Sequence, residues 1–455
     1  MRKRIRKGII SILYLIPLFV GTIGYLIQGE SFSDALYGGI DLYSMGSATN
    51  VCNGYIEFAR WTAPLVTATV VLCVLRSVWQ SLRLRMHLLG REDSVAVYSD
   101  EKLKIAFNPT TKVIYPGDTF KEYAKSHILM FSSDEKNLRF YEEHKEELSE
   151  KAVYMGLRDL ELGCMKEMKN VTLFDVNGTI ARLLWKDIAI WEKQISNCKI
   201  VVYGDGALAQ TIMATGLQRN LFSLEQKLEY YVISQRHYFM RKHHDMPLMN
   251  GDSIHYYAMD ENIIWDIIAA ADIVIIAEKI ELDQLQTIIV RAEKASVYYY
   301  SPEEGDTVSY LAFDGLIPFG RNAEVLTDEN IRKQEMVRKA VLFNEKYAEE
   351  YQGEKDWNKL SGFLKASNIS SVDYGEVIAA LPSIISDETI AELEHIRWCR
   401  FHYLNYWKYG LPENGQRKDT KNRVHRDLKP YNELDEEEKE KDNIAVRLWR
   451  SDGKI

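Results

Sequence analysis

Apolar residues gather in two segments near the start of the chain. The first covers residues 8–27 without a charged side chain. A helix rises 1.5 Å per residue, so this length reaches across the roughly 30 Å hydrocarbon core of a bilayer. The second covers residues 61–75, and Arg76 can extend its charged end outward so that the helix continues through Trp79. The pattern predicts two membrane-spanning helices in residues 1–91.

The charges around these segments predict their orientation. Basic residues precede the first segment at positions 2–7 and follow the second at positions 76–91. Acidic residues dominate the connection between them, where Asp34 and Asp41 lie. Because basic flanks stay on the cytoplasmic side, we expect a protein of the cell inner membrane with two spans and both termini in the cytoplasm.

The connection between the two apolar segments resembles the pore loop of two-helix potassium channels. Residues 33–37 read SDALY and match the start of the family's pore helix. The family's selectivity filter would fall on residues 44–48, and the candidate pore residues are Asp41, Ser44, Met45, Gly46 and Ser47. Only Gly46 is kept from the filter pattern, so the resemblance implies a pore whose ion selectivity stays open. The alternative is an ordinary loop that joins two membrane anchors.

The pore interpretation agrees with the physics of the bilayer and has two consequences. Non-helical backbone at membrane depth is tolerated where it lines a water-filled path. A ring of Asp41 carboxylates there would favour cations. Because two helices cannot enclose a pore, the resemblance implies a homo-oligomer, with a tetramer as the family expectation.

From Ser94 onward, short β-type runs alternate with helical patterns, which predicts a parallel sheet covered by helices. The clearest unit is the buried-type strand KIVVY at residues 199–203, followed by a glycine turn that opens a helix. Glycines there let the backbone approach a phosphate, and the helix N-terminus favours the anion. The predicted nucleotide-binding residues are Gly204, Asp205, Gly206, Ala209 and Arg236.

The α/β region also repeats itself. Residues 95–107 echo residues 200–212, and VTLFD at 171–175 echoes LAFD ending at Asp314. The first copy lacks one βαβ-length stretch and has no glycine turn. We expect two tandem Rossmann-like domains, 92–195 and 196–325, which resemble the TrkA-N type domains that regulate potassium conductance.

The second copy departs from the dinucleotide pattern. The strand LEYYVIS should be followed by an acidic residue that holds ribose hydroxyls, but Arg236 stands nearby instead. Arg236 would favour an extra phosphate. The alternative is a Rossmann fold that has lost its nucleotide. Four histidines lie close in the sequence between residues 237 and 255, but their spacing matches no metal site, and we expect a polar surface segment there.

The remainder predicts a helical connector and a small C-terminal domain. A helical pattern at 328–351 and a linker-like stretch form the connector, 326–384. Ser386 is a candidate N-cap for a helix that ends at Gly410, and an acidic helix follows within residues 432–449.

This C-terminal block, residues 385–455, carries E-H-x-x-W at 394–398, W-x-Y-G at 407–410 and L-x-P-Y-x-x-L at 428–434. The block resembles the RyR domain, the repeat of ryanodine receptors, which implies a small, mainly α-helical fold. Aromatic faces beside cations suit a nucleotide-like ligand, whereas the alternative is that these aromatics form the domain core. The candidate ligand-binding residues are His395, Trp398, Trp407, Tyr409, Lys418, Arg423 and Tyr431.

Composition narrows the function. The net charge is −9 and the mean hydropathy is −0.27, and there is no large basic patch, so a nucleic-acid partner is not expected. Five cysteines form no CxxC pair, and no catalytic constellation is recognisable, so we expect neither a metal site nor an enzyme.

These features favour a multidomain membrane protein with a two-helix domain, two α/β Rossmann-like domains and an RyR domain. The expected function is a ligand-gated oligomeric cation channel whose cytosolic domains sense a small nucleotide-like ligand. The RyR resemblance implies a sensor in a signalling or an antiviral conflict system, and an antiphage effector is one outcome of such a channel. The alternatives are a membrane-anchored nucleotide-sensing scaffold without conductance and, more weakly, an NAD(P)-dependent oxidoreductase.

Overall fold

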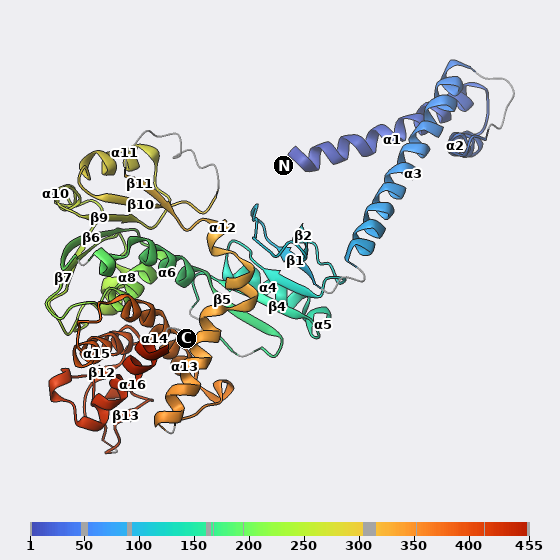
Figure 1. The fold of residues 1–455 in the computed structure, drawn as a ribbon. Helices are drawn as coiled ribbons and strands as arrows, with labels where there is room; N and C mark the ends of the chain where they lie inside the picture. Colours follow the sequence, from blue (N-terminus) through green and yellow to red (C-terminus); the bar gives the residue numbers. More distant parts are fainter. Residues whose placement is uncertain are drawn as a thin grey trace. The chain divides into compact units, whose positions relative to one another are not determined.

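The chain forms two compact units, Met1–Glu92 and Asp93–Ile455. A computed structural model describes them, and Figure 1 shows their elements. The described residues are 2–46, 53–88, 93–160, 165–166, 168–193, 195–303, 315–351, 353–413 and 415–452.

The first unit consists of two long helices that pack on each other and a short helix that packs on the first of them. Side-chain caps define where its helices begin. Ser31 accepts a hydrogen bond from the Asp34 backbone N–H, and Asn53 accepts one from the Ile56 N–H. The Asn53 amide also donates to the Gly24 carbonyl at 2.8 Å, which ties the first long helix to the second. The helices are α1 (Arg2–Ile27), α2 (Phe32–Asp41) with the 3₁₀ turn η1 (Leu42–Ser44), and α3 (Gly54–Leu88).

Glycines allow these helices to approach closely. A Cβ atom at Gly38 of α2 would lie 2.7 Å from the Tyr25 ring of α1, and one at Gly24 would lie 2.7 Å from Ile56 of α3. Small residues at helix crossings are typical of helix packing in membranes.

One helix of this unit has the length and composition of a membrane span. The segment Gly54–Arg76 of α3 qualifies, and 11% of its most apolar window is buried inside the structure. The apolar part of α1 for which side chains are described, Leu13–Ile27, is shorter. Large side chains such as Phe19 and Trp61 are exposed at 62% and 75%. The two-span arrangement therefore stays a prediction, with one candidate span.

The second unit begins with a five-stranded parallel sheet. Its strand order is β2-β1-β3-β4-β5, and every neighbouring pair is parallel. The strands are β1 (Ser94–Tyr98), β2 (Lys112–Gly117), β3 (Ser126–Leu129), β4 (Ala152–Leu157) and β5 (Val171–Asp175). The helices of this part are α4 (Asp134–Glu143), α5 (Lys145–Leu148), α6 (Val176–Ile188) and α7 (Ile190–Lys193).

A six-stranded parallel sheet follows, in the order β11-β10-β9-β6-β7-β8. Its first strand lies inside the sheet and later strands extend in both directions, which is the Rossmann-type strand order. The strands are β6 (Asn197–Tyr203), β7 (Lys227–Ile233), β8 (Ser253–Tyr257), β9 (Ile273–Ile276), β10 (Ser296–Tyr300) and β11 (Leu316–Phe319). The helices are α8 (Ala207–Arg219), α9 (Tyr238–His243), α10 (Ile264–Ala269) and α11 (Leu282–Arg291). The prediction of Rossmann-like parallel sheets is confirmed.

Two details of this sheet differ from the sequence prediction. The segment expected to be a polar surface holds the strand β8, and His243 is 8% exposed and packs on Phe239 with ring centroids 4.8 Å apart. The LAFD segment that echoes VTLFD, residues 311–314, lies outside the described residues. The edge strand next to β10 is β11, which begins at Leu316.

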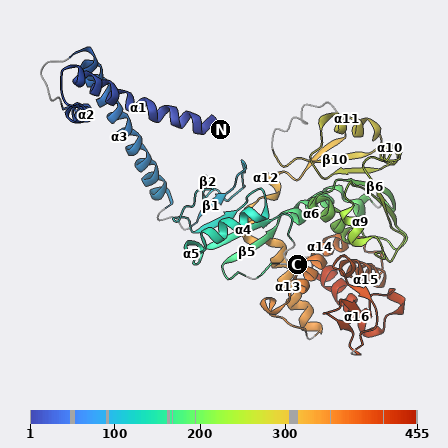
Figure 2. The ribbon, with the colours of Figure 1, turned by 180° about the vertical axis from the view of Figure 1, so that it is seen from behind.

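Helices α13 to α16 gather beside the second sheet, drawn in orange to red in Figure 1 and seen from behind in Figure 2. Helix α14 was expected to be linker-like, but residues such as Val372 and Val377 are buried in the core. The elements after β11 are α12 (Asn322–Val325), the π-helix η4 (Glu329–Lys333), α13 (Glu335–Tyr351), the 3₁₀ turn η5 (Trp357–Lys359), α14 (Gly362–Ala380), α15 (Asp387–Leu404), β12 (Lys408–Tyr409), β13 (Lys418–Asp419), β14 (Val424–His425), the 3₁₀ turn η6 (Tyr431–Glu433) and α16 (Glu436–Asp452).

The limits of α15 are confirmed at one end and wrong at the other. Ser386 caps the helix by accepting a hydrogen bond from the Thr389 N–H, as predicted. The helix ends at Leu404 rather than Gly410, because Tyr406 takes a left-handed φ of 64° and Lys408 then pairs with the strand β14.

One hydrophobic core runs through both sheets and the C-terminal helices. It includes Ile128 of β3, Ile212 of α8, Val377 of α14 and Ile396 of α15, each of them buried. The C-terminal block therefore packs into the same core as the two sheets and is not an independent domain on a linker.

Candidate functional site

The predicted pore residues meet at the C-terminal end of α2. The Ser44 hydroxyl donates to the Asp41 carbonyl at 2.8 Å and to the Asp41 carboxylate at 3.1 Å. The Gly46 N–H donates to the Asp41 carbonyl at 3.1 Å, and Met45 between them has a left-handed φ of 66°. A Cβ atom at Gly46 would collide with the Asp41 carboxylate, so a larger residue there would have to displace the Asp41 side chain. Ser47 lies outside the described residues.

Side chains of the protein itself occupy the hydrogen-bonding groups of the glycine turn in the second sheet. The Asp205 N–H, which a phosphate would need, donates to the Glu278 carboxylate at 3.0 Å. The Asp205 carboxylate accepts the backbone N–H groups of Gln235 and Arg236. The space lined by Gly204, Asp205 and Ala209 is only about 10 Å³. In this conformation a phosphate would have to displace the Glu278 carboxylate from the Asp205 N–H.

Two other residues of the predicted Rossmann site contribute little to a pocket. Gly206 is the N-cap of α8 in an extended conformation and a Cβ atom there would meet nothing within 4 Å. Arg236 is exposed, and its guanidinium lies 5.8 Å from the Tyr238 ring centroid.

The candidate ligand residues of the C-terminal block fall into two groups. Trp398 and Trp407 lie together with two buried histidines, His402 and His425. The Trp398 ring is 4.0 Å from His402 and 5.0 Å from His425. Burial lowers the pKa of His402 to about 3 and that of His425 to about 4, so both rings are neutral near pH 7.

The other group is exposed on the small three-stranded sheet. Tyr409 and Lys418 lie on β12 and β13, and both are register partners of His425. Arg423 takes a left-handed φ of 51°, donates to the Asn405 carbonyl at 2.9 Å, and lies 5.7 Å from the Tyr406 ring centroid. These residues present two cations and one tyrosine to solvent.

His395 joins three parts of the C-terminal block. Its Nε2 lies 2.8 Å from the Lys429 carbonyl and its Nδ1 lies 3.3 Å from the Asp442 carboxylate, and its ring is 5.9 Å from that of Tyr431. Burial favours the neutral ring, but the Cys399 sulfur and the Asp442 carboxylate more than offset it, and the pKa of His395 is raised well above its ordinary value. A ring that faces a carbonyl on one side and a carboxylate on the other is suited to donate from both nitrogens.

The neighbouring motif residue also has a structural role. The Glu394 carboxylate pairs with Arg397 through hydrogen bonds of 2.7 and 2.8 Å, and Ser371 of α14 donates to it at 3.2 Å. The E-H-x-x-W motif therefore fastens α15 to its neighbours.

Two buried arginines that the sequence did not single out join the C-terminal helices to the second sheet. Arg400 of α15 is fully buried and donates to the Leu217 and Leu248 carbonyls, to Asn250, and to the Asp252 carboxylate at 2.8 Å. Arg219 of α8 bonds Asp373 and Glu376 of α14. Because these partners are more than 140 residues apart, no local pattern could have revealed them.

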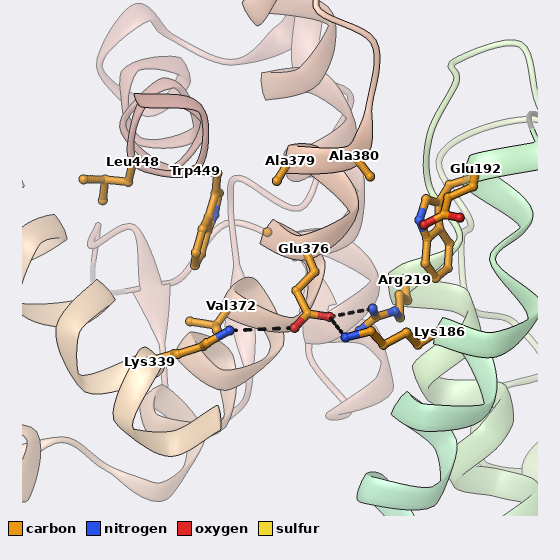
Figure 3. A pocket seen from close by; sticks show the side chains of 12 residues that line it. Lys186, Glu192, Arg219, Lys339, Val372, Glu376, Ala379, Ala380, Leu448 and Trp449 are labelled. Atoms are coloured by element: carbon orange, nitrogen blue, oxygen red, sulfur yellow. Dashed lines mark hydrogen bonds and ion pairs between the residues drawn. The ribbon is translucent and has the colours of Figure 1, made fainter. Parts of the chain in front are cut away.

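The larger of the two described cavities lies where α6, α7, α8, α13, α14 and α16 meet. It has a volume of about 360 Å³. Glu376 lies at its centre, with Lys339 on one side and Arg219 and Lys186 on the other (Figure 3). Burial opposes ionisation of Glu376, but the Arg219 hydrogen bond and the two lysines outweigh it and lower the pKa of Glu376. None of these residues was predicted from the sequence.

The fold and these contacts define a protein in which two Rossmann-like parallel sheets share one core with a C-terminal helical block. The sequence model of the RyR domain matches this block over residues 380–448. A comparison with curated proteins gives no match.

Proposed function

We propose that the chain is a subunit of an oligomeric, ligand-gated cation channel, in which residues 1–92 form the membrane pore and residues 93–455 the sensor. The observation that carries the proposal is the arrangement of α2. This short helix stands between α1 and α3 in the sequence, packs on α1, and ends in the Asp41–Gly46 turn, the part of the chain that resembles a channel pore loop. Non-helical backbone of this kind is tolerated at membrane depth where it lines a water-filled path.

The exposed side chains of the first unit support a membrane setting and further subunits. Phe19, Trp61, Leu65 and Leu72 are each more than 60% exposed. Large apolar side chains exposed in such number are usually covered by lipid or by protein. An oligomer would bring several copies of the Asp41 turn around one axis, and the carboxylates would attract cations.

The second unit supports the sensing part of the proposal. A hydrophobic core runs through both sheets and the C-terminal helices, so a change at one part of residues 93–455 can affect the rest. A ligand shifts such a body between two states when it binds one state more tightly than the other. Opening of such a pore would depolarise the membrane, an outcome that fits an antiphage effector.

The test is a planar bilayer recording of the purified full chain with candidate nucleotides on the sensor side. We expect cation-selective conductance, and we expect Asp41→Asn to reduce the preference for cations. The matched control is Asp34→Asn, which changes the same side chain at the opposite end of α2 and should leave selectivity unchanged.

Absence of any conductance with every nucleotide would contradict the channel. A chain whose residues 1–88 are replaced by an unrelated membrane anchor then tests the alternative. Full cellular activity of that chimera would identify a membrane-anchored sensor without conductance.

A further inference from the structure

We propose that the cavity around Glu376 binds the phosphate group of a small anionic ligand, and that Glu376 holds the place of that phosphate when the ligand is absent. The site is separate from the glycine turn and from the exposed cations of the small sheet. It rests on the proposed function only in assuming that the second unit senses a small ligand.

The cavity has more hydrogen-bond donors than the Glu376 carboxylate uses. Lys186, Lys339 and Arg219 all face the Glu376 carboxylate. The two lysine ammonium groups are 3.8 and 3.9 Å from its oxygens, which is beyond hydrogen-bond distance. Only the Arg219 Nη2 donates to it at 2.9 Å. The lysines therefore have donors to spare for a second acceptor.

Two buried N–H donors beside the cavity have no hydrogen-bond partner among the described residues. They are the Arg219 Nε and the Trp449 Nε1, and both side chains line the cavity and are at least 94% buried. A buried N–H group without a partner costs about 1–3 kcal/mol, so a ligand acceptor that reaches either group after a small side-chain movement would recover part of that cost.

The Trp449 ring itself is not available for stacking. Its ring lies parallel to Phe343 at 4.8 Å on one side, and a Cβ atom at Gly375 would collide with it on the other. Trp449 can therefore contribute its N–H edge but no face, which favours an acceptor-rich group over a flat base at this position.

The charge balance agrees with an exchangeable anion. Acidic groups near the cations are Glu376, Asp373, Glu192 and Glu335. Asp373 remains bonded to Arg219 from α14 whether or not Glu376 turns away. Glu376 is about one third exposed, so its side chain can leave the cations when a phosphate takes its place.

Size sets the ligand class. A cavity of about 360 Å³ is at the lower end of the roughly 300–1,000 Å³ of small-molecule sites, which is more than inorganic phosphate fills. Apolar side chains of Val372, Ala379 and Leu448 line the remaining wall. The geometry thus suits a phosphorylated molecule of mononucleotide size.

Isothermal titration calorimetry on the full chain in detergent tests the proposal with four probes: inorganic phosphate, pyrophosphate, AMP and adenosine. We expect heat of binding with the three phosphate compounds and none with adenosine. Adenosine binding as tightly as AMP, or no binding by any phosphate compound at millimolar concentration, would overturn the proposal.

Two variants act in opposite directions. Lys186→Gln with Lys339→Gln removes two charged donors and should weaken binding by about tenfold or more. Glu376→Gln removes the competing carboxylate and should tighten binding. The matched control is Lys145→Gln, which removes an exposed lysine that pairs with Glu142 at 3.1 Å outside the cavity and should leave binding unchanged.

The two opposite signs keep the proposal testable if one variant folds poorly. Weaker binding in Glu376→Gln would contradict the exchange of carboxylate for phosphate. Binding is measured without ion flux, so binding without conductance would remove the channel and keep this site, and conductance without binding would do the reverse.

Discussion

The buried pair of Arg400 and Asp252 gives the sharpest prediction about how the C-terminal helices are held to the second sheet. Both side chains are fully buried, and the Arg400 guanidinium makes four hydrogen bonds of 2.7–2.9 Å. Arg400→Met keeps much of the apolar volume but leaves the Leu217 and Leu248 carbonyls without this donor.

The expected cost follows from the state of Asp252 in that variant. Its carboxylate would stay buried and keep only the Gln226 amide and the Leu228 N–H as donors. Breaking a buried ion pair on one side costs about 3–5 kcal/mol, against a total of about 5–15 kcal/mol for a folded domain. We therefore expect a large part of the free energy of unfolding to be lost.

The assay is urea unfolding of the full chain in detergent, followed by hydrogen–deuterium exchange in the peptide that covers α15. The matched control is Arg139→Met, because Arg139 pairs with Glu135 at 2.8 Å on an exposed helix surface. That loss should stay below about 0.5 kcal/mol.

A double-mutant cycle separates the pair from general damage. Arg400→Met combined with Asp252→Asn should cost less than the sum of the two single changes, because the second change removes the unpaired charge. The buried pair would not hold the helices in the way described if Arg400→Met left the free energy of unfolding within about 1 kcal/mol of the unchanged chain. The same would follow if the costs of the two single changes simply added in the double variant.

Three further predictions concern single positions. The pKa of His395 is raised in the folded chain, so its protonated ring stabilises the fold fully below the unfolded pKa of about 6.5. This stabilisation is lost as the pH rises through the folded pKa. The thermal unfolding midpoint should therefore fall with rising pH. Asp442→Asn should flatten that pH profile, and an unchanged slope would contradict the role of the carboxylate. Gly375→Ala should destabilise the chain by about 1–3 kcal/mol in urea unfolding, because its Cβ atom collides with Trp449, whereas Gly353→Ala, with its nearest neighbour at 3.7 Å, should not. Gly38→Ala should loosen the contact of α2 with Tyr25 and speed limited proteolysis of residues 1–92. The control is Gly54→Ala, because a Cβ atom at Gly54 meets nothing within 4 Å. Equal cleavage rates for the two variants would count against close helix packing.

Local patterns predicted the α/β part of the fold well. Alternating β-type and helical runs indicated parallel sheets, and the missing βαβ stretch of the first copy corresponds to a sheet with one strand fewer. The N-cap at Ser386 was also predicted, because a cap depends on residues within one helical turn.

Features set by tertiary contacts were missed. The strand β8 lies in a histidine-rich segment that reads as polar surface, and α14 lies in a segment that reads as a linker. The end of α15 was placed too late because Trp407 is drawn into the core and Lys408 pairs with β14, which no helical periodicity reveals.

The candidate site shows the same division. The sequence singled out the glycine turn at Gly204, but it could not show that Glu278, 73 residues after Asp205, fills it. The cavity residues come from helices that lie far apart in the sequence, so Lys186, Lys339 and Glu376 carry no shared motif.

The central claim is that a ligand bound by residues 93–455 controls the passage of cations through residues 1–92. The most direct measurement is cation efflux from liposomes that contain the purified full chain, with and without AMP. We expect efflux that depends on AMP and that is lost when Lys186→Gln and Lys339→Gln are combined, but not in Lys145→Gln. Liposomes that stay sealed under all conditions, or efflux that is the same with and without the ligand, would contradict it.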